Sequence, residues 1–343
     1  EIERIQADVE KSKGRPVDES QDFKMAEELM YGKAATALEK LDERVSDITS
    51  IMKDNGITEQ DITDYLYALH APERNALLLE REGVDNGSGI SDLEAQEIID
   101  EIAKSGKLKA FEEAGQKIQD IAQDTRNTMR KLGLETDARI DAFEDMFKNY
   151  VPLAGIAIDE SGENVGTYPS GSTGFHVSGS RIKKAEGRKT PAINLFAQTV
   201  HMNAATHVRG QKNEVMKSLY NLIKENSNKD VWSVFDPEKK GEKRSIGNLD
   251  VVGVRVDGKQ MAMQFADPSH AQSLRDMGVS KTNTFLKVMR GLSGWLRRSY
   301  TTLRPEFAIN NFVRDIGSAV FNASAETEIE GGVLNGQKVV KDM

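Results

Sequence analysis

Cysteine is absent from the 343 residues of this chain. Its absence excludes disulfide scaffolds, zinc sites with thiolate ligands, iron–sulfur clusters and a cysteine nucleophile. Aromatic residues make up only 6% of the sequence, which argues against a platform on which nucleic-acid bases stack. The sequence also lacks a run of about 18 apolar residues, so no segment of it predicts a transmembrane helix.

The charge balance is acidic, with 46 Lys and Arg residues against 55 Asp and Glu residues and a net charge of −9. This balance argues against a protein that coats nucleic acid along its whole length, although local basic stretches remain candidates for contact. Hydrophobic residues account for 38% of the chain, which is typical of helices with much exposed surface. The first residue is Glu1 rather than Met, and we expect the chain to be part of a longer protein.

The first 150 residues have the periodicity of long helices. Apolar residues recur every three or four positions, a spacing that places them on one stripe, as in a coiled-coil seam. A second periodic segment covers residues 108–132, and a helix of about 25 residues spans about 38 Å. Two such rods joined by short helices predict an elongated bundle of antiparallel helices. The first stripe consists of Leu38, Leu41, Val45, Ile48 and Met52.

Several residues mark predicted helix ends. Thr58 with Asp61, and Ser91 with Glu94, have the spacing of capping boxes, in which the N-cap and N3 side chains bind each other's backbone N–H groups. Pro72 is typical of a first helical turn, because proline lacks the N–H that an interior position uses. We therefore expect a helix to start at Pro72.

Residues 228–266 are the only clear strand region. Asp257 and Gly258 separate two alternating runs, and this dipeptide is typical of a type I′ hairpin turn. The sequence thus predicts a mainly α fold: an elongated helical bundle with long antiparallel helices and a small subdomain that contains a β-hairpin. The predicted regions are an elongated helical region at 1–153, a Gly/Ser-rich and then basic loop at 154–190, a helix and small β-hairpin subdomain at 191–268, amphipathic helices at 269–326 and a polar tail at 327–343.

No set of residues predicts catalysis, a cofactor or a metal. His201 and His207 are six positions apart and face different sides of a helix, whereas a zinc pair needs a spacing of four. The acidic turn near residue 85 resembles a calcium loop. With Gly89 at the sixth loop position, however, Val84 stands where the first carboxylate belongs. The glycine-rich string at 171–174 lacks the lysine of a phosphate loop. We expect a non-enzyme, with any catalytic activity in other modules of a longer chain.

Two basic stretches are candidate contact sites. The first follows the Gly/Ser-rich loop and is interpreted either as a solvated loop or as a contact with DNA or another anionic partner. The second combines six cations and no acidic residue with an apolar stripe, which indicates a helix that binds a membrane surface or a partner, or else a stripe that faces the core. The first set is Arg181, Lys183, Lys184, Arg188 and Lys189; the second is Lys281, Phe285, Lys287, Arg290, Trp295, Arg297, Arg298 and Arg304.

Four strings in a fixed order resemble the large polyvalent-protein-associated domain of phages. They are residues 65–75 (YLYALHAPERN), 87–95 (GSGISDLEA), 150–153 (YVPL) and 304–315 (RPEFAINNFVRD). The resemblance covers residues 61–322. It implies a segment of a very large phage protein, and it carries no catalytic residue over to this chain.

The resemblance leads to a first hypothesis, a non-enzymatic structural segment of a large virion protein. Such a segment would be packaged in the particle, would assist genome ejection and delivery, and would form homo-oligomers beside other virion proteins. It would be located in the virion interior and then in the host envelope or cytoplasm, where it could contact nucleic acid or the membrane surface. A second hypothesis is an antirestriction module that binds and protects incoming phage DNA, and a third is a cryptic hydrolase.

Overall fold

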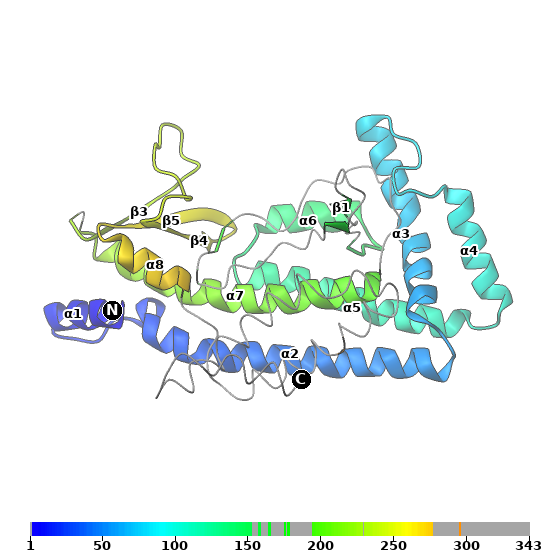
Figure 1. Cartoon of the computed structure of the whole chain (residues 1–343), viewed down its shortest axis with the longest axis horizontal. Coiled ribbons are helices and arrows are strands. Elements are labelled where there is room, and N and C mark those ends of the chain that lie inside the picture. The colour runs from blue at the N-terminus through cyan, green and yellow to red at the C-terminus, as the bar shows by residue number, and fades with distance from the viewer. Residues whose placement is uncertain are drawn as a thin grey trace, which may run out of the picture.

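The fold is mainly α with a small antiparallel sheet, as the sequence predicts (Figure 1). The computed structural model describes residues 2–152, 157–158, 164–165, 175, 177–178, 194–228, 230–276 and 295. Within these residues the elements are α1 (Ile2–Lys13), η1 (Glu19–Gln21), α2 (Phe23–Asp54), α3 (Glu59–Glu82), α4 (Asp92–Lys104), α5 (Leu108–Lys131), α6 (Asp137–Met146), β1 (Ala157–Ile158), β2 (Asn164–Val165), α7 (Leu195–Glu225), β3 (Trp232–Phe235), β4 (Val251–Val256), β5 (Lys259–Phe265) and α8 (Pro268–Asp276).

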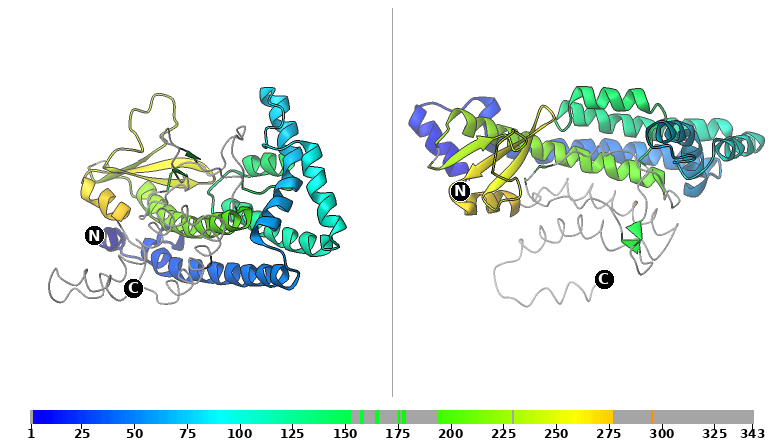
Figure 2. Two further views of the ribbon diagram at one scale, coloured as in Figure 1. Left: turned by 45° about the vertical axis from the view of Figure 1, so that its right-hand side comes forward. Right: turned by 90° about the horizontal axis from the view of Figure 1, so that it is seen from above.

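Three long helices, α2, α5 and α7, lie side by side and form the body of the molecule (Figures 1 and 2). α2 has 32 residues and α7 has 31, so each spans about 48 Å at 1.5 Å per residue. The predicted stripe of α2 is buried along its whole length, and it joins α3, α5 and α7 in one hydrophobic core. The 3–4 spacing of apolar residues therefore encodes the helix contact surface, as a seam-like pattern should.

The predicted helix starts at Thr58 and Ser91 are confirmed. The Asp61 backbone N–H donates to Thr58 Oγ1, and the Thr58 N–H donates to the Asp61 carboxylate at 2.8 Å. Ser91 and Glu94 make the same reciprocal pair at the start of α4. These bonds satisfy N–H groups that the first helical turn leaves without intrahelical acceptors.

The expectation that a helix starts at Pro72 is wrong. Pro72 lies inside α3, which continues for ten residues beyond it to Glu82. A proline inside a helix removes one backbone hydrogen bond and costs about 3 kcal/mol. Here Leu66 and Leu78, on either side of Pro72, are both fully buried. We attribute the continuity of α3 to this burial, since each fully buried leucine contributes about 2 kcal/mol.

The sheet lies at the end of the body where α2 begins and α7 ends. Its strand order is β3-β5-β4, and both pairings are antiparallel. The predicted turn is confirmed, with φ of 49° at Asp257 and 75° at Gly258. Glycine is required at Gly258 because a Cβ there would lie 2.1 Å from the backbone nitrogen of Thr136. The hairpin turn therefore packs directly against the chain that links α5 to α6.

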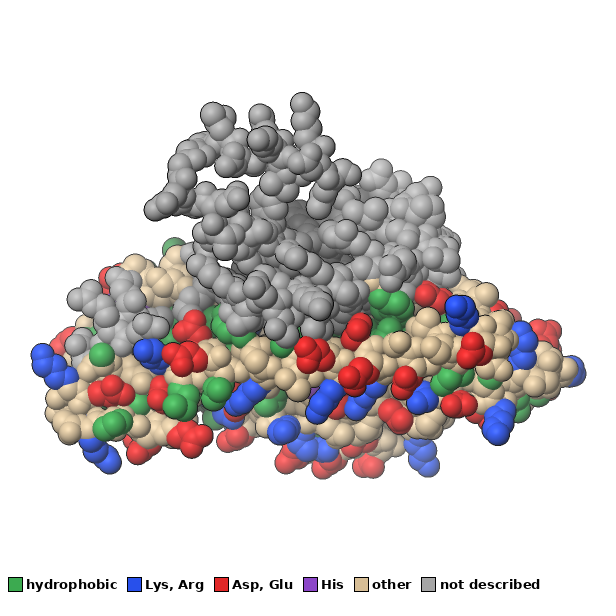
Figure 3. All heavy atoms as spheres, turned by 90° about the horizontal axis from the view of Figure 1, so that it is seen from below, with side chains coloured by type: hydrophobic (Ala, Val, Ile, Leu, Met, Phe, Trp, Pro, Cys, Tyr) green, Lys and Arg blue, Asp and Glu red, His purple; other side chains and the backbone are tan. Residues whose placement is uncertain are grey.

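Charged side chains cover the face of the body that includes α2. Figure 3 shows Lys and Arg interspersed with Asp and Glu along this face, without a large area of one sign. None of the helices that the structure describes is both long and apolar enough to cross a bilayer.

Candidate functional site

Most residues of the two predicted basic sites lie outside the described residues. This holds for Arg181, Lys183, Lys184, Arg188 and Lys189, and for every member of the second set except Trp295. Trp295 packs edge-on against Phe196 of α7, with ring centroids 4.9 Å apart and an interplanar angle of 66°. It is partly buried against the main core. Its indole therefore faces the bundle, which is the contact that a core-facing stripe makes.

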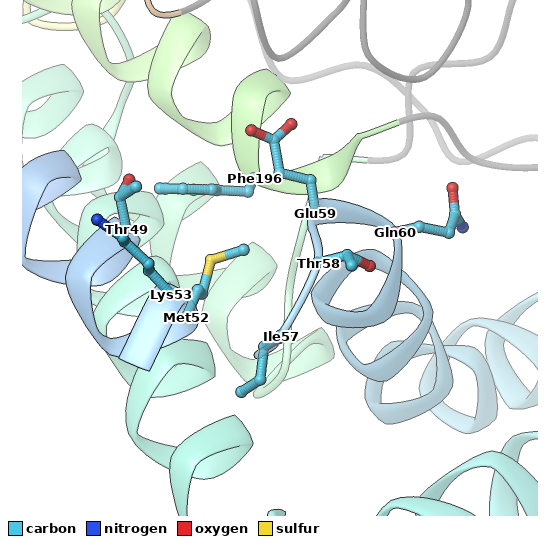
Figure 4. A pocket seen from close by; sticks show the side chains of 8 residues that line it. All are labelled: Thr49, Met52, Lys53, Ile57, Thr58, Glu59, Gln60 and Phe196. Carbon is cyan, nitrogen blue, oxygen red and sulfur yellow. The ribbon is translucent and has the colours of Figure 1, made fainter. Parts of the chain in front are cut away.

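A groove of about 450 Å³ adjoins Phe196, between the end of α2 and the start of α3 (Figure 4). Met52 and Phe196 reach into the groove, while Gln60 points away from it. The carboxylate of Glu59 at its rim accepts a hydrogen bond of 2.8 Å from the Asn194 side chain, at the N-cap of α7. Glu59 thus helps to fix the start of α7. The apolar lining of the groove is better suited to holding an apolar side chain than to catalysing a reaction.

The end of α3, the turn that follows it and α4 form a two-helix arm beside the main body (Figures 1 and 2). We call residues 75–104 the arm. Asn75, which is buried, organises its turn: the side-chain oxygen accepts from the Ser88 N–H at 2.8 Å, and the amide donates to the Ile90 carbonyl and to the Asp92 carboxylate. Tyr67 donates a further hydrogen bond to the Ser88 carbonyl. The turn is therefore held by buried polar groups and has a fixed conformation.

A second cluster joins α3 to the segment after α6. Glu73 accepts hydrogen bonds of 3.1 Å from both the backbone and the side-chain nitrogen of Asn149, and it lies 3.7 Å from His70 Nδ1. Burial opposes the charge of Glu73, but the nearby His70 imidazole and the hydrogen bonds from Asn149 lower the pKa of this carboxyl below its usual value. Burial lowers the pKa of His70, whose ring packs against Phe147 and Tyr150.

These two clusters bring together three of the four strings on which the phage resemblance rests. Residues 65–75 form the middle of α3, residues 87–95 form part of the turn and the start of α4, and Tyr150 belongs to the third string. The fourth string, residues 304–315, lies outside the described residues. The first two strings are neighbours in the sequence, whereas the third is distant from both and meets α3 through the ring contact between His70 and Tyr150.

Further polar pairs connect the long helices. His207 of α7 lies 3.0 Å from Asp124 of α5, and the Asn203 amide donates to the same carboxylate at 3.0 Å. The hydrogen bond from His207 is the largest cause that lowers the pKa of Asp124 to about 2. The Thr128 hydroxyl lies 3.5 Å from the same imidazole nitrogen that faces Asp124. In a catalytic triad, one ring nitrogen of the histidine faces the nucleophile and the other faces the carboxylate. Here both partners face the same nitrogen of His207, so the geometry suits a contact that holds α5 and α7 together.

An almost fully buried ion pair fixes the sheet to the bundle. Arg255 of β4 lies 3.3 Å from the Glu135 carboxylate and donates to the Leu134 carbonyl at 3.0 Å and to the Gly258 carbonyl. Asn213 of α7 accepts from the Arg255 backbone N–H at 2.8 Å. Sequence reasoning missed these residues and Asn75, since a single Arg or Asn among apolar residues gives only a weak signal of a buried anchor. In the described part of the chain, no three His, Asp or Glu side chains are grouped so that they could hold a metal ion.

No family model, no curated protein and no solved structure matches this chain. Its function is therefore inferred from its own residues and geometry.

Proposed function

We propose that this chain is a non-enzymatic structural segment of a large phage virion protein. It is packaged in the particle, assembles with copies of itself and with other virion proteins, and takes part in delivery of the genome into the host. The phage assignment rests on the four sequence strings described above.

The polar groups inside the body support a mechanical role. The pairs Asp124–His207 and Arg255–Glu135 both cross between elements that are distant in the sequence. Removal of one partner from a buried pair such as Arg255–Glu135 is costly, so this pair fixes the sheet to the bundle, and the partly buried pair Asp124–His207 adds a weaker contact between α5 and α7. This arrangement suits a stiff body that transmits or resists force within an assembly.

The observation that carries the assembly role is the position of the exposed apolar side chains. In the described residues, the large apolar side chains that are exposed lie near the two ends of the elongated body. Contiguous exposed apolar groups mark sites of protein contact, and we propose that the two ends of the body are such sites. Four lie where α2 begins and the strands start, and three lie on the arm: Met25, Leu29, Val231 and Leu249, and Leu79, Val84 and Leu93.

Sedimentation velocity of the purified chain over a concentration series tests this role. We expect oligomers whose population increases with concentration. Leu29→Ser combined with Leu249→Ser should shift the chain toward monomer, because both side chains are exposed at one end of the body. Lys40→Ser, an exposed position on α2, is the matched control and should leave the distribution unchanged. A chain that sediments as a monomer at every concentration would contradict the proposal.

A further inference from the structure

The arm presents an apolar surface to solvent. Leu79 is 54% exposed, Val84 is 38% exposed and Leu93 is 70% exposed. All three are in the turn at the tip of the arm or in the helical turns next to it. We call these three side chains and the carboxylates around them the arm surface. Three large exposed apolar side chains at one tip indicate a contact with another protein.

The charges around these side chains are nearly all negative. Between residues 79 and 101 there are eight exposed carboxylates and one cation, Arg81. On α4, Leu93, Glu97 and Glu101 follow each other at intervals of four and share one outer stripe of the helix. The face that includes α2 carries both signs interspersed, so the arm surface differs from that face (Figure 3).

The arm surface is also preorganised. Asn75 and Tyr67 hold the turn through buried hydrogen bonds, and Ser88 within it is fully buried. The turn packs so closely on α3 that a Cβ at Gly87 would lie 2.5 Å from Leu78 Cδ1. A rigid surface loses little conformational entropy on binding, which favours affinity.

We infer that the arm surface binds the basic segment 281–304 of a second copy of this chain, an inference that rests on the proposed assembly role. Charge complementarity identifies this partner, because that segment carries six cations and no acidic residue. Its Lys and Arg side chains lay their aliphatic stems on the leucines of the arm and extend their charged ends to the carboxylates. Trp295 is not needed for this contact, since it packs against Phe196 of its own chain.

A synthetic peptide of residues 281–304 tests the inference by fluorescence anisotropy with the full chain. We expect binding that weakens about tenfold or more when salt is raised, because salt screens exposed charges. Glu97→Lys combined with Glu101→Lys should weaken binding by about tenfold or more. The matched control, Glu39→Lys with Glu43→Lys, reverses two exposed carboxylates at the same spacing on α2 and should bind the peptide as the unmodified chain does.

A charge exchange in the full chain provides the second part of the test. Glu97→Lys with Glu101→Lys should reduce oligomer formation, and adding Lys287→Glu and Arg290→Glu should restore it. If the peptide binds equally well to the arm variant and to the control variant, the inference is overturned, even when the chain forms oligomers. If the chain is monomeric at every concentration, the contact between two copies fails together with the proposed assembly role, even when the isolated peptide binds at the arm.

Discussion

Replacement of Asn75 by Ala should open the arm without unfolding the body. Asn75 accepts one hydrogen bond, from the buried Ser88 N–H, and donates two, to the Ile90 carbonyl and the Asp92 carboxylate. An unsatisfied buried N–H costs about 1–3 kcal/mol, and the bond to a charged acceptor adds to this loss. We therefore expect a loss of about 2–4 kcal/mol in the free energy of opening the arm.

Amide hydrogen exchange measures this loss directly. The contacts between α3 and α4 form a small core of Ala68, Ala71 and Ala95, which touches the main core of the body through the partly buried Ile90. Opening of the arm can therefore occur without opening of α2, α5 and α7. In the Asn75→Ala variant, protection of residues 86–104 should fall by a factor that corresponds to the predicted loss, while protection of α2 and α7 stays unchanged.

The control for this experiment is Gln96→Ala. Gln96 is exposed on α4 and makes a single bond, to Asp100, so its loss should change the opening free energy by no more than about 0.5 kcal/mol. If Asn75→Ala lowers protection of the arm no more than Gln96→Ala does, the buried network does not hold the turn. The argument that the arm surface is preorganised would then fail.

Two further predictions concern the polar pairs Asp124–His207 and Arg255–Glu135, and urea denaturation measures both. The Asp124 pKa of about 2 against 3.8 corresponds to roughly 2 kcal/mol, reduced by solvent screening to about 1 kcal/mol. A lowered carboxyl pKa stabilises the fold at pH values above the pKa of the unfolded chain, so Asp124→Asn should lose this energy at pH 7. The difference in the free energy of unfolding between the variant and the unmodified chain should vanish as the pH falls from 4 to 2. A difference that stays constant over this range would refute the prediction. Arg255→Met should cost about 3–5 kcal/mol because Glu135 stays buried without its main partner, and adding Glu135→Leu should recover part of that loss; strictly additive losses would refute the pairing.

The helices, their caps and the hairpin turn were predictable because each depends on residues close in the sequence. The seam of α2 is an example, since Leu38 and Met52 belong to one 3–4 repeat that is buried throughout. The turn at Asp257 and Gly258 is another, since its backbone conformation is a property of that dipeptide. Local patterns of this kind need no knowledge of the tertiary structure.

Pro72 and the polar anchors were not predictable for the opposite reason. The continuity of α3 through Pro72 depends on burial against other helices, which a local rule does not contain. Asn75 is important because Ser88 lies next to it in space, 13 residues away in the sequence. Arg255 pairs with Glu135 across 120 positions, and no spacing rule connects them. The arm surface, likewise, becomes visible only when exposure is known for each residue.

Electron cryo-microscopy of the intact phage particle to which the proposal assigns this chain tests the central claim most directly. The account predicts several copies of the elongated helical body inside the particle, with the arm of one copy in contact with a neighbouring chain. Particles that lack this chain, while it is produced in the infected host, would contradict the account.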